Sequence, residues 1–431
     1  MRFIGIDIGT TSICGIVFDT ESQKIEKSVT LPNNSFIKSD KSFEKIQNTD
    51  VIMKTVYELF GELKADNIDA IGFSGQMHGI VYTDENGRAV SPLYTWQDER
   101  AAAEFKDGKS YAQTLGCFAG YGLATDFYNE KNGLLPKNAK YLCTIADYAV
   151  MQLCGLVKPL VHITNAASLG CFDVEKNSFI ITNSRLPEIT AEFKRAGEYK
   201  GIPVCVALGD NQASFIGSVS DEKNALINVG TGSQISWLSE KLVDAEGVEN
   251  RPFDGKRFLA AGCALCGGRA FAMLEKLFRE IANLVSETDV KSAYKQIDRL
   301  LENKTETTLS ADCRFCGTRN DPSVRGGVFN ISENNFTAAD LALSVLNGMA
   351  DELYQMYKNG GKKAEKLVCS GNGIRKNAAL RRIVSEMFGC EIRIPLFEEE
   401  ASFGAALAAS VACGFSENID KACEMIKYRE N

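Results

Sequence analysis

The chain contains no uninterrupted apolar run of the ~18 residues that a membrane-spanning helix requires, and no long run of basic residues. Its formal net charge is −8 at pH 7. Because nucleic acids and anionic membranes attract clustered Lys and Arg, we expect neither of them as a partner. The segment Met1–Asp7 carries an acid and lacks the apolar core of a signal peptide, so we expect a soluble, cytoplasmic protein.

The sequence also lacks a complete P-loop. Gly108-Lys109-Ser110 matches the end of that motif, but Ala103 stands where the first glycine is required, in a segment that we interpret as an Ala/Glu-rich helix. Without that glycine and a preceding strand, the backbone cannot form the phosphate cradle. This absence argues against a kinase of the P-loop class.

Cysteine is abundant, with fourteen residues, but its pattern does not indicate a disulfide framework. The chain has two Cys-x-x-Cys pairs, Cys263/Cys266 and Cys313/Cys316. About 46 residues separate these pairs, whereas a four-thiolate zinc site usually has roughly 15–20 between them. Small buried apolar side chains are therefore a better interpretation of these cysteines than structural zinc.

A glycine turn that occurs twice is the most informative positive feature. Asp7-Ile-Gly-Thr-Thr-Ser12 and Asn228-Val-Gly-Thr-Gly-Ser233 each lie between two short apolar runs. Strand, tight turn, strand is the pattern of a hairpin whose turn N–H groups converge on an anion, and glycine permits the close approach. Two such turns at equivalent places in 431 residues predict a duplicated domain that holds a polyphosphate.

The rest of the chain alternates short apolar runs with amphipathic segments, which predicts an α/β fold. Helices are predicted over Thr49–Leu63, from Thr337 onward and over 377–389. No Pro/Ser-rich linker separates the two halves, so the boundary near 217–221 is expected to be a compact hinge. A ligand bound in a cleft between two domains suits that arrangement.

Two acids follow predicted strands and are candidates for chemistry. Asp7, beside the first glycine turn, suits a magnesium ion that bridges nucleotide phosphates; the alternative is an Asx cap on the turn. Asp210 lies where a carboxylate can reach a substrate hydroxyl; the alternative is an N-cap for the helix that follows.

Two polar segments suit recognition of a polyol. Gln76, Met77 and His78 offer hydrogen-bond donors, acceptors and an apolar face, although a lone histidine is usually structural. Trp96-Gln97-Asp98-x-Arg100 adds an aromatic platform with polar groups; the alternative is a core Trp beside a salt bridge at a helix start.

With these motifs in place, the chain resembles the FGGY family of carbohydrate kinases over nearly its whole length. The matching motifs of the first half are 5–12, 74–79, 95–98, 145–148, 164–168 and 206–214. Those of the second half are 228–234, Gly267-Gly268, 370–377 and 400–406.

The resemblance implies two actin-like, ribonuclease H-like domains with a ligand cleft between them: a sugar-binding and catalytic domain over 1–217 and a nucleotide-binding domain over 218–431. It implies phosphoryl transfer from ATP, with Mg²⁺, to a small-molecule sugar. The implied metal and phosphate residues are Asp7 with Thr10, Thr11 and Ser12, then Gly230, Thr231, Gly232 and Ser233, with Gly267 and Gly268. The implied adenosine contacts are Gly371, Asn372 and Asn377. The implied sugar contacts are Gln76, Met77, His78, Trp96, Asp98, Asp210 and Asn211, with Asp210 as general base.

The chain departs from the family pattern at two ligand loops and near 327–331, where the second family signature lacks its usual late glycine. The usual triple glycine of the adenosine loop is Gly371-Asn372-Gly373, and Cys266 replaces the asparagine that often precedes Gly267. Within the family, 95–98 and 148–168 favour a ketose acceptor, sedoheptulose, phosphorylated at its terminal hydroxyl. Xylulose, another ketose or a polyol is the alternative substrate. The twin turns alone also allow a non-enzymatic actin-like ATPase, and the sequence leaves the oligomeric state open.

Overall fold

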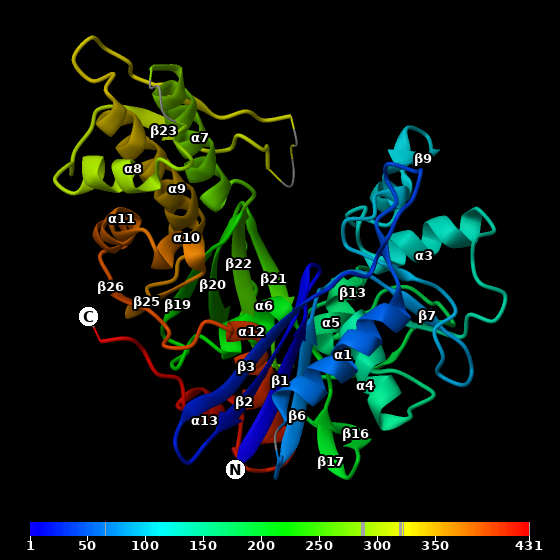
Figure 1. The fold of residues 1–431 in the computed structure, drawn as a ribbon. Coiled ribbons are helices and arrows are strands. Elements are labelled where there is room, and N and C mark those ends of the chain that lie inside the picture. The colour runs from blue at the N-terminus through cyan, green and yellow to red at the C-terminus, as the bar shows by residue number, and fades with distance from the viewer. Residues whose placement is uncertain (65, 286–288, 319–320, 322, 431) are drawn as a thin grey trace. The chain divides into compact units, whose positions relative to one another are not determined.

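The computed structural model describes residues 1–64, 66–285, 289–318, 321 and 323–430 (Figure 1). The chain forms two compact units, and two segments of its second half belong to the first of them. Unit 1 comprises Met1–Asp221, Arg251–Leu259 and Glu399–Ile426. Unit 2 comprises Glu222–Asn250, Ala260–Glu398 and Lys427–Asn431. Each unit is described separately below.

Unit 1 is built on a seven-stranded sheet in the order β16-β17-β6-β1-β2-β3, with β18 also paired to β6. The strands are β1 (Arg2–Ile8), β2 (Ser12–Asp19), β3 (Lys24–Pro32), β6 (Ala70–Gly75), β16 (Arg195–Tyr199), β17 (Ile202–Cys205) and β18 (Leu208–Gly209). Strands β1 and β2 form the predicted hairpin, β3 extends it to an antiparallel meander, and β6 runs parallel to β1. The apolar runs of β1 and β2 are buried because both faces of the sheet are covered by helices.

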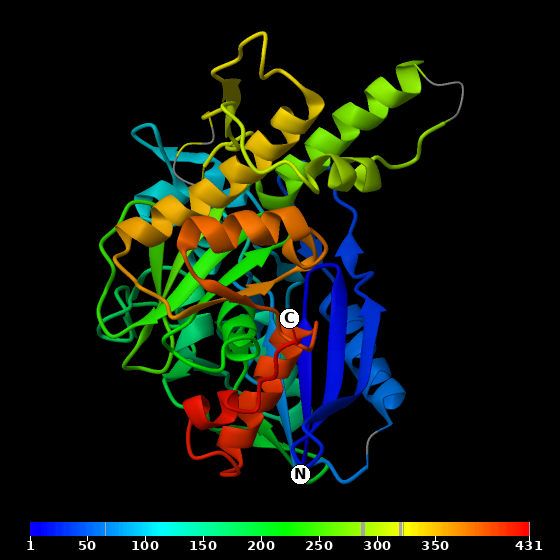
Figure 2. The same cartoon turned by 90° about the vertical axis from the view of Figure 1, so that its left-hand side faces the viewer.

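Helices α1 (Thr49–Leu63) and α12 (Glu400–Ala412) cover opposite faces of this sheet. Leu59 and Leu63 of α1 pack over Gly15 of β2, whereas α12 meets β1 and β6 on the other side, as Figure 2 shows. Helices α4 (Ile145–Cys154) and α6 (Asp210–Ile216) complete the layers.

Helix α12 approaches the sheet backbone to backbone. A Cβ added to Gly72 would lie 1.9 Å from the carbonyl oxygen of Ala405, and one added to Gly5 would lie 1.8 Å from that of Ser402. The helix is rich in Ala, so its own side chains permit this approach. Gly404 of α12 meets the backbone of α6 at Ala213 in the same way.

Unit 2 repeats the hairpin of unit 1. Its six-stranded sheet has the order β21-β22-β20-β19-β25-β26. The strands are β19 (Ala225–Val229), β20 (Ser233–Ser239), β21 (Val248–Pro252), β22 (Phe258–Ala264), β25 (Lys366–Ser370) and β26 (Glu391–Arg393). As in unit 1, a glycine turn joins two antiparallel strands, and the first of them has a parallel neighbour, here β25. The predicted duplication of an α/β domain is confirmed.

Helix α9 (Ala338–Asn359) is the centre of the helical layer of unit 2. It contacts β20 and the helices α7 (Gly267–Val285), α8 (Tyr294–Leu301) and α11 (Ala378–Phe388). Its buried stripe includes Leu346, Met349 and Leu353, which join the core around Trp237 of β20. The short helix α10 (Asn372–Arg375) follows β25.

The remaining elements are short. In unit 1 they are β4 (Phe36–Ile37), β5 (Ile46–Gln47), β7 (Val81–Thr83), β8 (Leu93–Tyr94), η1 (Arg100–Ala102), β9 (Glu104–Lys106), β10 (Lys109–Ser110), α2 (Tyr111–Thr114), α3 (Gly122–Lys131), β11 (Tyr141–Cys143), β12 (Leu160–His162), α5 (Ile163–Ser168), β13 (Phe172–Asp173), β14 (Ser178–Phe179), β15 (Glu188–Thr190) and α13 (Ile419–Cys423). In unit 2 they are β23 (Ser310–Asp312) and β24 (Gly327–Phe329).

Local sequence signals correctly located the helices predicted over Thr49–Leu63, from Thr337 onward and over 377–389. The predicted helix Thr49–Leu63 is α1, and Thr337 caps α9 by accepting from the backbone N–H of Asp340. Asn377 caps α11, and Gly389 ends that helix with φ 62°. The predicted Ala/Glu-rich helix around Ala103 is wrong: only the single turn η1 forms, and β9 and β10 then pair as a hairpin.

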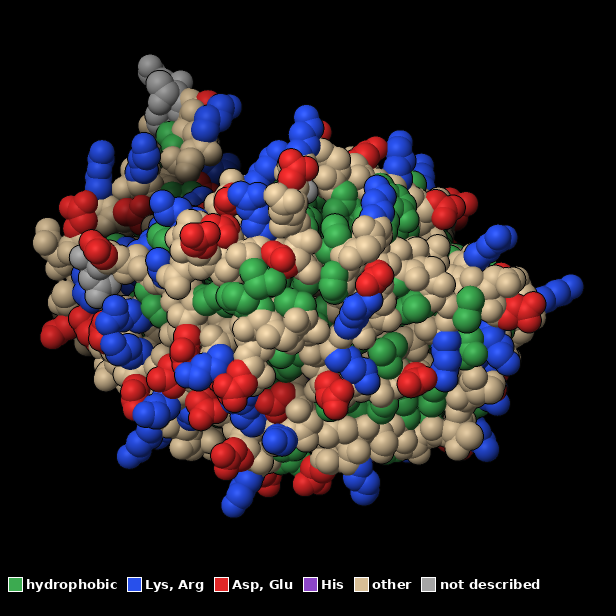
Figure 3. Space-filling view, turned by 90° about the horizontal axis from the view of Figure 1, so that it is seen from below, with side chains coloured by type: hydrophobic (Ala, Val, Ile, Leu, Met, Phe, Trp, Pro, Cys, Tyr) green, Lys and Arg blue, Asp and Glu red, His purple; other side chains and the backbone are tan. Residues whose placement is uncertain are grey.

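Within the part of the chain that the structure describes, no helix combines the length and apolarity needed to span a bilayer. On the face shown in Figure 3, basic and acidic side chains are interspersed. No disulfide joins the cysteines among the described residues.

The contact between α12 and the sheet gives a stability prediction. Gly72→Ala places a methyl group inside the van der Waals radius of the Ala405 carbonyl oxygen, so we expect a loss at or above the ~1–3 kcal/mol typical of overpacking. Gly61→Ala, in α1, is the matched control, because nothing lies within 4 Å of its added Cβ. Alanine there should leave stability unchanged or raise it by up to ~1 kcal/mol. Urea unfolding of both variants checks this, and equal midpoints would contradict the proposed close packing.

Candidate active site

The first glycine turn is fixed by a closed network of polar side chains. Thr10 Oγ1 accepts from Trp96 Nε1 at 3.0 Å and donates to Gln76 Oε1 at 3.3 Å. Gln47 Nε2 donates to the Thr10 carbonyl oxygen at 2.8 Å, and Gln76 Nε2 donates to Gln47 Oε1 at 2.9 Å. The Trp96 side chain is nevertheless 47% exposed, so its ring remains accessible beside the turn. The turn and the two predicted sugar-binding segments therefore meet at one place, where Thr11 is exposed.

Asp7 lies on β1, one residue before the end of the strand, and faces β6. Ser74 Oγ donates to its Oδ1 at 2.7 Å. Burial raises the pKa of Asp7, the Ser74 hydrogen bond lowers it, and the negative charge of Glu399 raises it again. The Asp7 side chain is thus held by one hydroxyl near the negative charge of Glu399, rather than used to cap the turn.

Asp210 is the first residue of α6, directly after β18. Burial raises its pKa to about 7; the charge of Asp7 acts in the same direction, whereas the Arg251 guanidinium lowers it. Asn211 Nδ2 donates to Asp210 Oδ1 at 2.9 Å. The backbone cap of α6 is Gly209, which makes no side-chain cap bond, so Asp210 does not serve as the N-cap.

A chain of buried hydrogen bonds holds the backbone that precedes Asp210. The Gly209 N–H donates to Thr164 Oγ1 at 3.1 Å, and that oxygen lies 3.1 Å from His162 Nδ1. His162 Nε2 lies 3.2 Å from the Ala191 carbonyl oxygen, so the neutral ring carries its proton on Nε2 and accepts from Thr164. Burial lowers the pKa of His162 to about 4, which keeps the ring neutral. This second histidine is therefore structural.

His78 is held in an unusual backbone conformation. Its φ is 73°, a region that non-glycine residues rarely adopt and that carries strain of ~1–3 kcal/mol. Its backbone N–H donates to Ser168 Oγ at 3.1 Å, and its Nδ1 donates to the Ser168 carbonyl oxygen at 2.8 Å. The ring stacks on Tyr121 with centroids 4.4 Å apart. These contacts place the imidazole lone pair on Nε2 and fix the ring plane.

Met77 and Asn211 link this loop to Asp210. Met77 is buried and its sulfur lies 3.4 Å from Asn211 Nδ2. A Cβ on Gly209 would lie 2.8 Å from the same sulfur, so the Met77 side chain packs directly against the start of α6. Gln76, Met77, His78, Asp210 and Asn211 are thus neighbours in unit 1.

Asp98 has a different environment from the other predicted sugar contacts. Its side chain is fully buried, and Oδ1 accepts from Arg100 Nε at 2.6 Å. Oδ2 accepts from Arg100 Nη2 at 3.1 Å and from the Lys45 backbone N–H at 3.0 Å. Arg100 also pairs with Glu44 and stacks on the Tyr94 ring at 4.2 Å. These bonds hold the Trp96 loop in place; direct contact of Asp98 with a sugar stays a prediction.

The second glycine turn, in unit 2, is bonded to the start of α7. The N–H groups of Gly268 and Arg269 donate to the carbonyl oxygens of Gly230 and Thr231, each at 3.0 Å. Gly267 packs on Gly232 so closely that an added Cβ would lie 2.5 Å from its carbonyl carbon. Gly230 and Thr231 are exposed, whereas Gly232 and Ser233 lie deeper.

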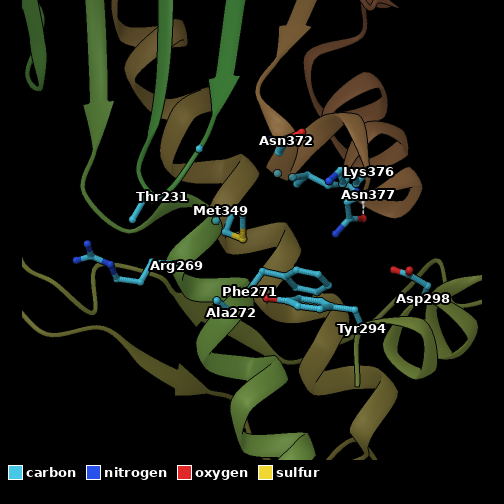
Figure 4. Close-up of a pocket in the computed structure, with 14 residues that line it drawn as sticks. Thr231, Arg269, Phe271, Ala272, Tyr294, Asp298, Met349, Asn372, Lys376 and Asn377 are labelled. Carbon is cyan, nitrogen blue, oxygen red and sulfur yellow. Dashed lines mark hydrogen bonds between the residues drawn. The ribbon is translucent and has the colours of Figure 1, made fainter. Parts of the chain in front are cut away.

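A cavity of about 680 Å³ extends from this turn into unit 2 (Figure 4). It is lined by Gly230, Thr231, Gly268, Arg269, Phe271, Ala272, Tyr294, Asp298, Met349, Asn372, Gly373, Lys376, Asn377 and Leu380. In Figure 4, Thr231 and Arg269 lie at one end and Lys376, Asn377 and Asp298 at the other. The rings of Phe271 and Tyr294 lie between the two ends, with centroids 5.5 Å apart.

Asn377 presents an unsatisfied donor to this cavity. Its Oδ1 accepts from the Leu380 N–H at 2.8 Å, whereas its buried Nδ2 has no hydrogen-bond partner within the described chain. A buried amide without a partner costs free energy unless a ligand satisfies it. The cavity therefore combines a glycine turn, an aromatic surface and an amide donor, a combination that suits a nucleotide.

Five of the nine nucleotide residues predicted in unit 2 line the cavity, but nine of the fourteen lining residues were not among the predicted contacts. Gly230, Thr231, Gly268, Asn372 and Asn377 line it. Gly232, Ser233, Gly267 and Gly371 lie next to these residues in the chain without lining it. The cavity residues that sequence reasoning missed are Arg269, Phe271, Ala272, Tyr294, Asp298, Met349, Gly373, Lys376 and Leu380. Gly373 and Lys376 lie within the matching segment 370–377, and Phe271 follows two glycines early in α7, so these positions carried a usable signal.

The carboxylate oxygens of unit 1 fit a magnesium ion whose coordination is completed by nucleotide phosphates. Among the described residues, no group of three or more His, Cys, Asp or Glu side chains is arranged to hold a metal alone. The charge of Glu399 acts on Asp7 and that of Asp7 acts on Asp210, and the Asp7 carboxylate offers hard oxygen ligands. Mg²⁺ is usually held by one or two carboxylates together with water and phosphate oxygens.

The environment of Asp98 gives a prediction that separates a structural role from a sugar contact. Asp98→Ala leaves the buried Arg100 without its main partner, so we expect a loss of roughly 3–5 kcal/mol in unfolding free energy. Glu188→Ala, which removes the exposed pair with Lys158, should leave the unfolding midpoint nearly unchanged. An unaltered midpoint in Asp98→Ala together with a raised KM for sugar would support direct contact instead.

Known proteins match this chain along almost its whole length. Residues 2–217 match the N-terminal domain of the FGGY family of carbohydrate kinases, and residues 225–413 match the C-terminal domain of that family. The sedoheptulokinase of Mus musculus is 27% identical over 94% of this chain and 96% of its own length. The xylulose kinase of Staphylococcus xylosus is 24% identical over 95% of this chain and 90% of its own length.

Solved structures show the same fold at lower sequence identity. Ligand-bound xylulose kinase from Lactobacillus acidophilus superposes with a TM-score of 0.83 at 19% identity and covers 100% of this chain and 93% of its own. Plasmodium falciparum glycerol kinase with ADP gives 0.76 at 18% identity, with 98% and 92% covered. The duplicated actin-like fold and the match of both domains lead to one conclusion: the chain belongs to the FGGY family of carbohydrate kinases.

Proposed function

We propose that the protein transfers the γ-phosphoryl group of ATP to the terminal hydroxyl of a ketose, with sedoheptulose as the preferred acceptor. One observation carries this proposal: Asp210 stands at the start of α6 with its pKa raised to about 7, beside the His78 loop and within the field of Asp7. A carboxylate with a pKa near the working pH is well suited to accept a proton from a hydroxyl.

Asp210 is proposed as the general base. The Asn211 amide donates to one of its oxygens and so orients the carboxylate. The bonds from Gly209 to Thr164 fix the backbone from which it projects. A base held in this way can accept the hydroxyl proton as the bond to phosphorus forms, while positioning supplies most of the remaining catalysis.

The His78 loop and Trp96 are proposed as the sugar-binding surface. The His78 Nε2 lone pair can accept from a sugar hydroxyl, since Nδ1 is bound to Ser168. The exposed Trp96 ring offers an apolar face for the C–H groups of the sugar. The Gln76 side chain is buried and hydrogen-bonded to Thr10 and Gln47. Its proposed contact with the sugar is therefore limited to the place where this network borders the sugar-binding surface.

The cavity of unit 2 is proposed as the nucleotide site. The adenine ring stacks on Phe271 and Tyr294, and Asn377 Nδ2 donates to a ring nitrogen. The phosphates extend toward the exposed turn at Gly230 and Thr231, whose small residues permit close approach. The residues Thr10, Thr11 and Ser12 of the first turn are proposed to contact the terminal phosphates.

Asp7 is proposed to hold Mg²⁺, directly or through water. When bound, the ion neutralises negative charge on the transferring phosphoryl group. Ser74 orients the Asp7 carboxylate for this task. Glu399 and Asp210 keep the surroundings negative, which favours a divalent cation.

The choice of sedoheptulose is supported by similarity to named relatives. Sedoheptulokinases of Mus musculus and Homo sapiens are 27% and 26% identical to this chain. Xylulose kinases, at 24% and 23%, keep xylulose as the second candidate. Membership in the carbohydrate kinase family argues against the remaining alternative, a non-enzymatic actin-like ATPase.

The role of Asp210 predicts a specific kinetic defect. Asp210→Asn should lower kcat by ~10²–10⁴-fold and leave ATP affinity unchanged, because the amide keeps the shape but accepts no proton. In the wild type, kcat should be constant above about pH 7 and fall as pH drops below it, since the carboxylate becomes protonated. Steady-state assays from pH 5 to 9 measure both effects. Asp66→Asn, at an exposed acid outside the site, is the control; a kcat within a few-fold of wild type in Asp210→Asn would exclude the role.

The acceptor prediction is tested with a panel of sugars. Sedoheptulose has two hydroxymethine units more than xylulose, and each well-paired hydroxyl contributes around a tenfold preference. We expect kcat/KM for sedoheptulose to exceed the values for xylulose, ribulose, fructose and glycerol by about tenfold or more. The measurement is a coupled ADP assay under identical conditions. If xylulose or another sugar is preferred tenfold, the acceptor is wrong, although the kinase function stands.

A further inference from the structure

The two Cys-x-x-Cys motifs are brought together in unit 2, but through one cysteine of each. Cys316 Sγ lies 3.6 Å from Cys266 Sγ. The other two thiols are directed elsewhere: Cys263 Sγ donates to Gln234 Oε1 at 3.3 Å, and Cys313 Sγ donates to the Val345 carbonyl oxygen at 3.3 Å. The motifs therefore form a single thiol pair rather than a four-sulfur site.

The two thiols of this pair differ in accessibility and in charge. Cys266 is 1% exposed, whereas Cys316 is partly exposed. Arg269 Nη1 donates to Cys316 Sγ at 3.2 Å. The guanidinium lowers the pKa of Cys316, whereas burial raises that of Cys266 to about 12. A thiolate stabilised by a cation is the nucleophile in thiol oxidation, and an adjacent second thiol resolves the product.

We propose that Cys316 and Cys266 form an oxidative modification site, at which a hydroperoxide converts the two thiols into a disulfide. The site uses the accessible Cys316 as the attacking sulfur and the buried Cys266 as the resolving one. Nothing in the phosphoryl-transfer chemistry requires either thiol, and the disulfide forms independently of the proposed function.

The reaction balances with one peroxide per disulfide. The Cys316 thiolate attacks the terminal oxygen of the peroxide, the O–O bond breaks, and hydroxide leaves with the proton of the thiol as water. The Cys266 sulfur then attacks the resulting sulfenic sulfur, the S–O bond breaks, and the oxygen leaves as water with the Cys266 proton. The two thiols lose two electrons in total, and hydrogen peroxide is reduced to two molecules of water.

A second close thiol pair shows why distance alone is not decisive. Cys117 Sγ and Cys171 Sγ lie 3.5 Å apart in unit 1. The pKa of Cys117 is lowered by its hydrogen bond from Cys171, and no cation contributes to the shift. Cys316 has both the neighbouring thiol and the arginine. We therefore expect Cys316 to react with peroxide before Cys117.

Oxidation of the pair acts on the second glycine turn, and this consequence rests on the proposed nucleotide site. Cys266 directly precedes Gly267, and Arg269 lines the cavity beside Thr231. Shortening the S–S separation from 3.6 Å to about 2.05 Å pulls on the segment whose N–H groups bond Gly230 and Thr231. Loss of one such hydrogen bond weakens ATP binding about threefold to tenfold.

The test uses the full chain and hydrogen peroxide as the probe. Reduced protein is treated with peroxide, the remaining thiols are blocked with N-ethylmaleimide, and peptides are mapped without reduction. We expect a Cys266–Cys316 cross-linked peptide that dithiothreitol reverses, formed before any link involving Cys117. Calorimetry with ATP should then show a Kd raised threefold to tenfold after oxidation and restored by dithiothreitol.

Two variants keep the test decisive. Cys316→Ser should abolish both the cross-link and the change in Kd while retaining the basal activity. Cys390→Ser, at a partly exposed cysteine whose Sγ donates to the backbone oxygens of Ala364 and Phe388, is the matched control and should retain both effects. Absence of the cross-link in wild type, or an unchanged sensitivity in Cys316→Ser, overturns the modification site. A cross-link without any effect on Kd overturns the link to the nucleotide turn and leaves the kinase function untouched.

Discussion

The close approach of α12 to the sheet of unit 1 is the constraint on which the candidate catalytic centre depends. Only glycine at positions 5 and 72 lets the helix backbone come so near, since any Cβ would overlap carbonyl oxygens of α12. The same helix meets α6 through Gly404 and Gly217, again without side chains between the backbones. Because α6 begins at Asp210, the glycine contacts position the proposed base as well as the core.

This packing also gathers negative charge. Asp7 projects from β1 and Asp210 from α6, while Glu399 immediately precedes α12. Besides burial, the charge of Glu399 raises the pKa of Asp7, and the charge of Asp7 raises the pKa of Asp210. Such crowding of like charges opposes folding, and a bound divalent cation relieves it. A stability cost at this centre is therefore consistent with a role in binding and chemistry.

The cavity of unit 2 lies beside the same kind of hairpin as in unit 1, but helices α7 to α11 and their caps supply its other residues. The glycine turn is bonded to the start of α7, and the aromatic pair combines Phe271 of α7 with Tyr294 of α8. Asn377, from the cap of α11, supplies a donor that no residue of the described chain satisfies. The thiol pair at Cys266 and Cys316 joins this structure through Arg269, which touches both the cavity and the sulfur.

The sequence by itself determined the features that depend on neighbours along the chain. The glycine turns, the caps Thr337 and Asn377 and the periodic face of α1 act over a few residues, so local patterns locate them. The strand ends that carry Asp7 and Asp210 follow for the same reason. The helix expected near Ala103 failed because a hairpin between β9 and β10 overrides helical propensity there.

Tertiary structure decided the contacts between residues far apart in sequence. Gln47 reaches the turn at Thr10, and Cys316 reaches Cys266 across 50 positions; no local spacing encodes either meeting. The burial of Asp98 against Arg100 is likewise set by the surrounding core, although the two residues are only two positions apart. The physical reason is that the environment of a side chain depends on which surfaces pack together. Packing joins segments that lie far apart in the chain, and the local sequence of one segment does not specify the other.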